Sequence, residues 1–315
     1  DPTQTLVTVI GGSGFIGRYV VQALARRGHR LRVGVRRPDL AGHLQPLGKV
    51  GQILPVQANV RYPESVAAAV SGAHAVVNLV GVLAGSGAQS FDAVHVFGAE
   101  TVAECARVAG ARRLIHFSAI GADPESPSAY GRSKAEGEAR AFAAFPDATI
   151  VRPSIVFGPE DDFFNRFAGI ARFFPALPLI GGGRTLFQPV YAVDVAEAVA
   201  RLIETPSAES KTYEFGGPAV RSFREILEFV LATTGRKRLL VPVPWGVARI
   251  QGAVLGLLPR PLLTMDQVEM LRKDNVVSEQ ARAEHRTLEG LGIQPHSIEA
   301  IVPAYLYRYR KAGQF

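Results

Sequence analysis

Residues 8–20 read TVIGGSGFIGRYV, an apolar run that is interrupted by glycines and then takes on the spacing of a helix. Gly11, Gly14 and Gly17 form a GxxGxxG pattern, and this spacing lets a strand turn tightly into a helix whose first N–H groups face a phosphate. A tight turn without a ligand is the alternative. The residues expected to contact a nucleotide here are Gly11, Ser13, Gly14, Phe15, Ile16, Gly17 and Arg18.

The pattern around this loop predicts the fold class. Short β-branched runs alternate with helical patterns over the first 155 residues, and this alternation is typical of a parallel sheet covered on both faces. The predicted strands are 6–10, 31–35, 51–58, 75–80, 113–119 and 149–154. We therefore expect an α/β protein with a doubly wound parallel sheet of the Rossmann type, with a nucleotide-binding domain over 1–155 and parts of 185–216 completing its sheet.

The regular alternation ends beyond residue 155. Several prolines and the glycines at 181–183 indicate long connections, so 156–315 is expected to form a smaller, irregular C-terminal lobe that meets a substrate or a partner. Its predicted helices are 222–235, 245–258 and 264–272. The composition of 245–258 suits docking on a membrane interface or a partner helix, and an ordinary helix packed on the second lobe is the alternative.

Composition limits the partners. The 315 residues are 47% hydrophobic, enough for a large core, and the net charge of +7 suits an anionic partner such as a phosphorylated cofactor, an acidic protein or anionic lipid. The basic residues are dispersed and show no recognition motif, so a nucleic-acid partner is not expected. One cysteine and seven scattered histidines predict no metal site, and no apolar run reaches the roughly 20 residues of a transmembrane span.

The end of the second predicted strand indicates which dinucleotide is bound. An acidic residue that accepts from the adenosine ribose 2′-hydroxyl is expected there, but the chain has Arg36 and Arg37. A guanidinium can pair with the 2′-phosphate of NADP(H), and Arg18 could reach the same phosphate. We therefore expect NADPH as the cofactor, while Asp39 keeps NAD as the less favoured alternative.

A second group of residues suggests proton transfer. Tyr130 and Lys134 in YGRSK are four residues apart and share one face of a helix, and Ser118 closes the preceding strand. A lysine ammonium and a bound nicotinamide would lower the pKa of the tyrosine from about 10, so that its phenol could exchange a proton with a substrate while the serine orients the substrate oxygen. The alternative is an exposed helix on which these residues have no such role.

Together these motifs resemble the extended or atypical branch of the short-chain dehydrogenase/reductase superfamily over about the first 200 residues. The likeness includes IGGSGFIGR, YGRSK, RPSIVFGPED (152–161) and QPVYAVDVAEAV (188–199). The resemblance implies that Asn59 and Val60 flank the adenine, that Leu79, Val80 and Gly81 line the ribose, and that Pro153 lies beside the nicotinamide.

A narrower resemblance covers most of the chain. The segments 43–70, 145–168, 178–199 and 265–278 look like the nucleotide-binding accessory subunit of respiratory complex I and its bacterial relatives. This likeness implies a peripheral protein that meets complex I subunits at the matrix side of the mitochondrial membrane or the cytoplasmic face of the bacterial inner membrane. It also implies tightly bound NADPH that is mainly structural, with Ser118, Tyr130 and Lys134 vestigial.

Two other functions remain open on the sequence. A free-standing NADPH-dependent reductase or epimerase would use the same three residues on a small-molecule substrate held between the lobes. A redox-sensing regulator would bind NADP(H) and signal through a partner. Turnover would identify the first, and partner binding that differs between NADP⁺ and NADPH would identify the second.

Overall fold

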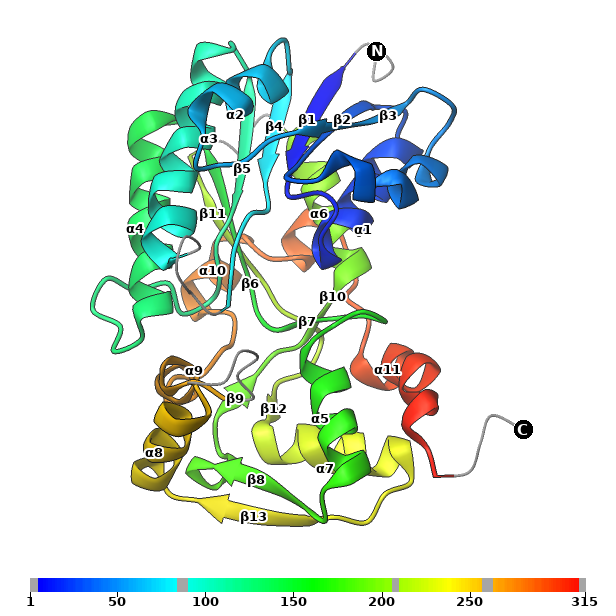
Figure 1. Cartoon of the computed structure of the whole chain (residues 1–315), viewed down its shortest axis with the longest axis vertical. Helices are drawn as coiled ribbons and strands as arrows, with labels where there is room; N and C mark the ends of the chain where they lie inside the picture. Colours follow the sequence, from blue (N-terminus) through cyan, green and yellow to red (C-terminus); the bar gives the residue numbers. More distant parts are fainter. Residues whose placement is uncertain (1–4, 84–89, 206–209, 257–262, 312–315) are drawn as a thin grey trace.

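The computed structural model describes residues 5–83, 90–205, 210–256 and 263–311. Its largest feature is a parallel sheet of seven strands (Figure 1). In spatial order these are β11 (Thr212–Phe215), β6 (Thr149–Pro153), β5 (Arg113–Phe117), β4 (Ala75–Asn78), β1 (Leu6–Ile10), β2 (Arg30–Val35) and β3 (Ile53–Gln57). The chain runs outward from β1 to β3 and then crosses back to β4, so the strand order reverses beside β1. The predicted doubly wound parallel sheet is confirmed.

Both faces of the sheet are apolar because successive side chains of a strand point to opposite faces. In β1, Val7 and Val9 pack into one core and Ile10 into the other, while the Thr8 hydroxyl donates to the carbonyl of Ala69 at 3.1 Å. Helices α1 (Phe15–Arg26) and α6 (Ala192–Glu204) cover the first face. Helices α2 (Pro63–Val70), α3 (Phe97–Val108) and α4 (Ala129–Ala144) cover the second.

A smaller lobe lies below the sheet in Figure 1. It is built on the parallel pair β8 (Ala176–Ile180) and β13 (Leu239–Val243), whose inner side packs against α5 (Phe163–Phe173), α7 (Phe223–Thr234) and α11 (Ile298–Leu306). Two short pairs lie between this lobe and the sheet: β7 (Val156–Phe157) with β10 (Val190–Tyr191), and β9 (Leu186–Phe187) with β12 (Arg221–Ser222). The chain returns from the lobe to the sheet to form β11.

The three helices predicted in this part of the chain are present as α7, α8 (Trp245–Leu255) and α9 (Met265–Met270), and a short α10 (Glu279–Ala283) follows. Capping residues explain where α7 begins and ends: Ser222 and Glu225 form a capping box at its start, and Gly235 ends the helix at a φ of 62°. Residues 257 and 258, predicted to extend α8, lie outside the described residues.

Helix α8 contributes little to the core of the lobe. Its buried residues are Ala248 and Gly252, whereas Val247, Ile250 and Val254 are exposed. Ala248 and Gly252 thus pack α8 onto the lobe, while its exposed apolar side chains point away from the small core at Ile180 and Val268, and docking of this helix on a partner or a membrane stays a prediction.

Candidate nucleotide site at the carboxyl edge of the sheet

The residues predicted to hold a nucleotide follow the ends of neighbouring strands. Parallel strands end at the same edge of a sheet, so the strand order fixes the order of these residues along that edge. From one side to the other they are Pro153 at the end of β6, Ser118 after β5, Leu79 to Gly81 after β4, Gly11 after β1, Arg36 after β2 and Asn59 after β3. The sequence-predicted nicotinamide residues and adenine residues thus lie at opposite ends of one continuous track.

The glycine loop leaves the N-terminus of α1 open. Its N-cap is Gly14, no side chain caps the helix and no acidic residue lies in the first turn, so the first N–H groups have no internal acceptor there. Gly11 needs its freedom because its φ is +83°, and a Cβ on Gly17 would lie 2.6 Å from the Cα of Gly12. Around these glycines, Ser13, Phe15 and Ile16 are half-buried. This arrangement fits a pyrophosphate at the helix N-terminus.

The arginines expected at the 2′-phosphate differ in their surroundings. Arg37 donates two hydrogen bonds to Asp39, at 3.0 and 2.7 Å, and both side chains are exposed. Arg36 is also exposed and has no hydrogen bond or ion pair within the described ranges. Arg18 turns toward the smaller lobe, where it forms an ion pair with Glu160 at 3.2 Å. Contact between these arginines and a 2′-phosphate stays a prediction.

The adenine and ribose positions are well ordered by local hydrogen bonds. Asn59 accepts from the N–H of Arg61 at 3.2 Å through its side chain, and Val60 is buried. The N–H of Val80 donates to the Asn78 side chain at 3.1 Å. A Cβ built on Gly81 would lie 3.2 Å from the Nζ of Lys134, so this glycine allows the loop after β4 to approach the lysine closely.

Ser118, Tyr130 and Lys134 meet at the end of β5. The Nζ of Lys134 donates to the carbonyl of Phe117 at 3.2 Å and lies 5.8 Å from the centre of the Tyr130 ring. The hydroxyl of Ser118 is buried and has no hydrogen-bond partner among the described residues. A buried hydroxyl without a partner is uncommon in folded proteins, and it fits a polar group of a bound molecule at this position.

Burial shifts the pKa values of Tyr130 and Lys134. It raises the pKa of Tyr130 to about 12, with a further contribution from the carboxylate of Asp266, and it lowers the pKa of Lys134 to about 8. The sequence led us to expect a lowered pKa for the tyrosine. That expectation concerns a site with a bound nicotinamide and stays a prediction; in the chain by itself, the cost of burying a phenolate and the nearby Asp266 charge both favour the neutral phenol.

Sequence reasoning missed His95, which connects two parts of the site. It lies in a short π-helical turn, Asp92–Val96, and accepts from the N–H of Val82 through Nε2 at 3.0 Å. Its Nδ1 therefore carries the proton and donates to Ser133 at 2.9 Å, and Ser133 donates to the carbonyl of Tyr130. Burial and Lys134 lower the pKa of His95 to about 3. A single histidine in a helical pattern gives no signal of this role.

Asp266 on α9 was also missed. Its carboxylate accepts from the hydroxyl of Ser128 at 2.9 Å and from the N–H groups of Ala129 and Tyr130 at 2.6 and 3.2 Å. A carboxylate at a helix N-terminus satisfies free donors and complements the helix dipole. The smaller lobe thus caps the helix that carries Tyr130 and Lys134.

Asn275 forms the second connection between the lobes. Its Oδ1 accepts from the Ser154 hydroxyl at 2.7 Å and the N–H of Ile155 at 3.1 Å, and its Nδ2 donates to the carbonyl of Ile120 at 3.0 Å. It joins the loops that follow β5 and β6. Asp266 and Asn275 both lie in the segment 265–278, MDQVEMLRKDNVVS. In the sequence this segment was notable only for its resemblance to complex I subunits, and the structure shows that it connects the two lobes.

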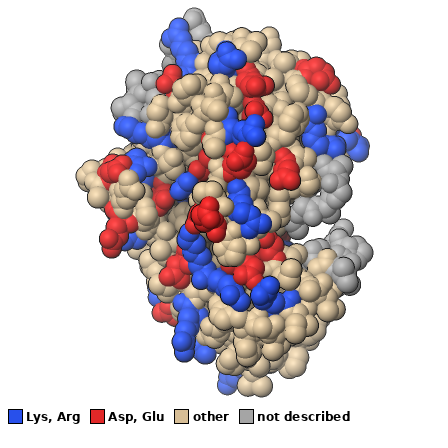
Figure 2. Space-filling view, turned by 90° about the vertical axis from the view of Figure 1, so that its left-hand side faces the viewer, with Lys and Arg blue, Asp and Glu red and all other residues tan. Residues whose placement is uncertain are grey.

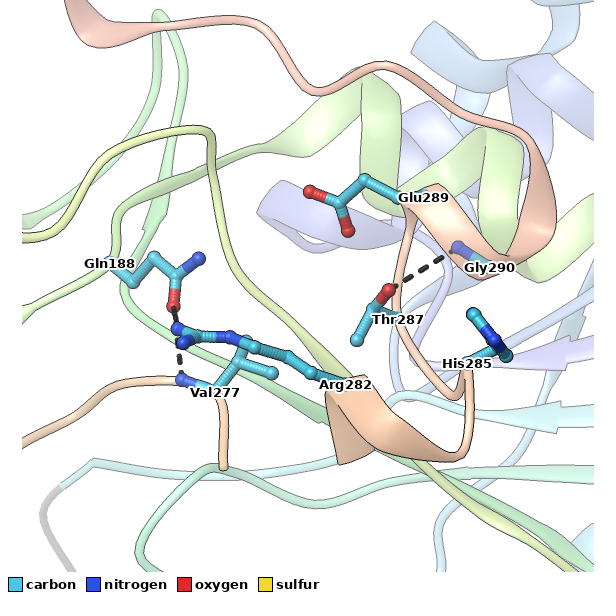
Figure 3. A pocket seen from close by; sticks show the side chains of 7 residues that line it. All are labelled: Gln188, Val277, Arg282, His285, Thr287, Glu289 and Gly290. Atoms are coloured by element: carbon cyan, nitrogen blue, oxygen red, sulfur yellow. Dashed lines mark hydrogen bonds between the residues drawn. The ribbon is translucent and has the colours of Figure 1, made fainter. Parts of the chain in front are cut away.

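A separate polar pocket lies near the outer edge of the sheet (Figure 3). It measures about 270 Å³. In Figure 3 the Oε1 of Gln188 accepts from the N–H of Val277 at 3.0 Å and from the Arg282 guanidinium at 3.3 Å. The remaining lining residues are His285, Thr287, Glu289 and Gly290. None of the residues predicted to bind a nucleotide lines this pocket.

The described residues contain neither a metal-binding cluster nor a membrane-spanning helix. No group of three or more histidine, cysteine, aspartate or glutamate side chains lies close enough to hold a metal ion. Among the helices of the described ranges, none combines the length and apolar character required to cross a membrane.

Comparison with known proteins extends the likeness across the chain. A family model described as the NAD dependent epimerase/dehydratase family matches residues 7–216. The chain is 36% identical to the mitochondrial NADH dehydrogenase (ubiquinone) 1 alpha subcomplex subunit 9 of Arabidopsis thaliana, over 98% of this chain and 79% of that protein. It is 35% identical to the subunit of the same name from Rattus norvegicus, over 97% of this chain and 80% of that protein.

A solved structure supports the fold. The dTDP-glucose 4,6-dehydratase of Bacillus anthracis, in complex with NAD, has a TM-score of 0.70 at 16% sequence identity, over 96% of this chain and 95% of that chain. This likeness concerns the fold alone.

Proposed function

Since this chain belongs to the NAD-dependent epimerase/dehydratase family and resembles complex I subunits along nearly its whole length, we propose that it is an NADP(H)-binding accessory subunit of respiratory complex I. The resemblance seen in the sequence is confirmed at the level of the family. The observation that carries the proposal is that 35–36% identity extends through the smaller lobe as well as the sheet. A likeness in the nucleotide domain alone would fit many unrelated enzymes.

The family binds a nicotinamide dinucleotide, and we propose NADPH rather than NADH. Arg36 is exposed at the end of β2 without a partner among the described residues, and Arg37 lies beside it. Two guanidinium groups favour a dianionic 2′-phosphate over a neutral hydroxyl. Asp39 is the feature that argues for NADH, and its pairing with Arg37 reduces its availability as an acceptor.

In this proposal the nucleotide is mainly structural. Bound NADPH supplies a hydride donor, but this chain's own residues are arranged to hold it: the loop of Gly11, Gly14 and Gly17 would bind the pyrophosphate, and Lys134 and Ser118 would bind the nicotinamide riboside. A ligand that binds only the folded state adds RT ln(1 + [L]/Kd) to the free energy of unfolding. Burial keeps the phenol of Tyr130 neutral, which makes it a poor proton acceptor at neutral pH, but a reductase would use the same neutral phenol as its proton donor, so the Tyr130→Phe variant separates the two roles.

We place the protein at the periphery of a respiratory membrane. Its relatives are named as mitochondrial complex I subunits, which suggests contact with other subunits of the complex. The side would be the matrix side in mitochondria or the cytoplasmic face in bacteria.

The test begins with the protein purified from its own membranes. We expect complex I subunits to co-purify, mass spectrometry to identify about one NADPH per chain, and the protein to show negligible NADPH oxidation with a panel of carbonyl compounds. Gly14→Val should lower nucleotide content and the melting temperature together, because a side chain there blocks the approach of the pyrophosphate.

The outcomes separate the three functions. Robust turnover that collapses by about two to four orders of magnitude in Tyr130→Phe would make the protein a free-standing reductase. Partner binding that changes between NADP⁺ and NADPH would make it a redox-sensing regulator. A Gly14→Val protein that loses its nucleotide and melts at the parent's temperature would overturn the structural role of the cofactor.

A further inference from the structure

The net positive charge of the chain arises in two segments that lack acidic residues, although the basic residues themselves are dispersed along the sequence. Residues 163–193 and 229–265 contain no aspartate or glutamate. Their basic residues are Arg166, Arg172, Arg184, Arg236, Lys237, Arg238, Arg249 and Arg260. The chain has 35 basic and 28 acidic residues, so the rest of the chain holds 27 basic and 28 acidic residues and has a net charge of −1. The whole excess of +7 therefore comes from these two segments.

The fold brings the two segments together in the smaller lobe. The first contains β8 and the second β13, which pair in parallel with Ala176 opposite Leu239. Arg238 donates to the carbonyl of Ala171 at 2.8 Å, which places its guanidinium beside the end of α5. In Figure 2 the lowest part of the molecule is mostly tan with scattered blue, and the red side chains gather higher up.

Four cations cluster where α5 ends and β13 begins: Arg172, Arg236, Lys237 and Arg238. Across the ranges that the structure describes, none of the four forms an ion pair. Burial lowers the pKa of Arg236, and the neighbouring Arg238 and Arg172 lower it further, so the cations are close enough to repel one another. Uncompensated positive charge of this density indicates a negatively charged partner.

Large apolar side chains lie exposed among these cations. Phe173 is 77% exposed, Phe174 53% and Leu239 72%, and Val241 points outward from the same strand. The Arg172 guanidinium lies 5.5 Å from the centre of the Phe173 ring. We call these four apolar residues and the four cations the basic apolar end. The exposed apolar residues of α8, which lies beyond the other end of β13, add further apolar surface to the same lobe.

We propose that the basic apolar end binds the surface of an anionic phospholipid bilayer. Its aromatic and aliphatic side chains enter the boundary between headgroups and acyl chains, and its cations pair with lipid phosphates. A polynucleotide would satisfy the cations and leave Leu239 and Val241 in water, so the mixed chemistry favours lipid. The inference rests on the proposed function, because it names the membrane contact of a peripheral respiratory subunit.

The experiment uses the full chain with its nucleotide and vesicles of phosphatidylcholine, with and without anionic phosphatidylglycerol. In a flotation assay the parent should bind the anionic vesicles, should bind neutral vesicles at least about tenfold more weakly, and should be released as salt rises. The variant Arg236→Glu/Lys237→Glu/Arg238→Glu should lose at least about tenfold in binding. Its control is Arg26→Glu/Arg30→Glu/Arg107→Glu, which makes the same charge change at exposed positions on the sheet domain.

A second pair of variants tests the apolar contribution without changing charge. Phe173→Ser/Leu239→Ser should weaken vesicle binding, whereas Val108→Ser, equally exposed at 77% on α3, should not. Melting temperature and nucleotide content are measured for every variant, so that loss of fold is recognised. If both charge variants lose binding equally, or if the parent does not bind anionic vesicles, the proposal is wrong.

Failure of this proposal is distinguishable from failure of the proposed function. A parent that co-purifies with complex I and ignores vesicles retains the proposed function and loses the lipid site. If the triple variant at 236–238 then fails to assemble while its control assembles, the surface binds an acidic protein and the lipid proposal is overturned. Vesicle binding without complex I association supports the lipid site and overturns the proposed function.

Discussion

Removing the side chain of Asn275 should destabilise the whole molecule, because the residue ties the smaller lobe to loops at the end of the sheet. The change Asn275→Ala deletes three hydrogen bonds, to Ser154, Ile155 and Ile120. Each contributes about 1 kcal/mol to the free energy of unfolding, and the backbone groups of Ile155 and Ile120 lose this partner inside the protein. We expect a loss of about 3 kcal/mol, equivalent to roughly 5 °C in melting temperature for a chain of this length.

The control is two residues away. Lys273→Ala removes an ion pair with Asp123 at 2.8 Å, in which the side chains are 58% and 34% exposed. Exposed pairs of this kind are worth less than about 1 kcal/mol, so this variant should melt close to the parent. Thermal and urea unfolding give both comparisons, and hydrogen exchange at the N–H of Ile155 should accelerate only in Asn275→Ala. Equal melting temperatures for the two variants would refute the reasoning.

Three further predictions follow from charge and burial. Asp39→Asn should free Arg37 and so strengthen NADPH binding by about two- to fivefold, which calorimetry can measure. If NADH binding is lost and NADPH binding does not improve, Asp39 is instead the acceptor for the ribose hydroxyl. Lys134 has a pKa of about 8 in the folded state against about 10.5 when unfolded, so the unfolded state binds more protons between these pH values. The free energy of unfolding of the parent should therefore rise by about 3 kcal/mol relative to Lys134→Met between pH 8 and 10.5. A difference between the two proteins that stays constant with pH in urea unfolding would contradict this. Burial lowers the pKa of His116 from about 6.5 to about 3, so the free energy of unfolding of the parent should fall by about 1.4 kcal/mol per pH unit below pH 6.5. The variant His116→Asn should not show this loss. If the free energies of unfolding of both proteins change in parallel with pH, His116 is not the cause.

The sequence predicted features that depend on local periodicity. The glycines at 11, 14 and 17 specify a strand, turn and helix within 13 residues, and the spacing of Tyr130 and Lys134 places both on one face of α4. Parallel strand ends then bring these groups to one edge. No contact between distant segments was needed for these predictions.

Features that depend on long-range side-chain contacts were not predictable in this way. The partners of Asn275 are 120 to 155 residues away, and the ion pair of Arg18 with Glu160 spans 142 residues. No composition or period in a single sequence encodes such pairings. The raised pKa of Tyr130 in the chain by itself was not predictable for the same reason, because its main cause is burial in the folded protein and the Asp266 charge that adds to it approaches from another lobe.

The position of Asn275 well after β11 in the sequence affects the order in which the protein can mature during synthesis. A nascent chain that has emerged to residue 220 already contains every residue predicted to hold the nucleotide, and also β11. It lacks the amide that joins the loops after β5 and β6 and the Asp266 carboxylate that caps α4. Those loops therefore cannot be fixed until residue 275 has emerged, and until then the sheet domain exposes them to chaperones and proteases although all its strands are already made.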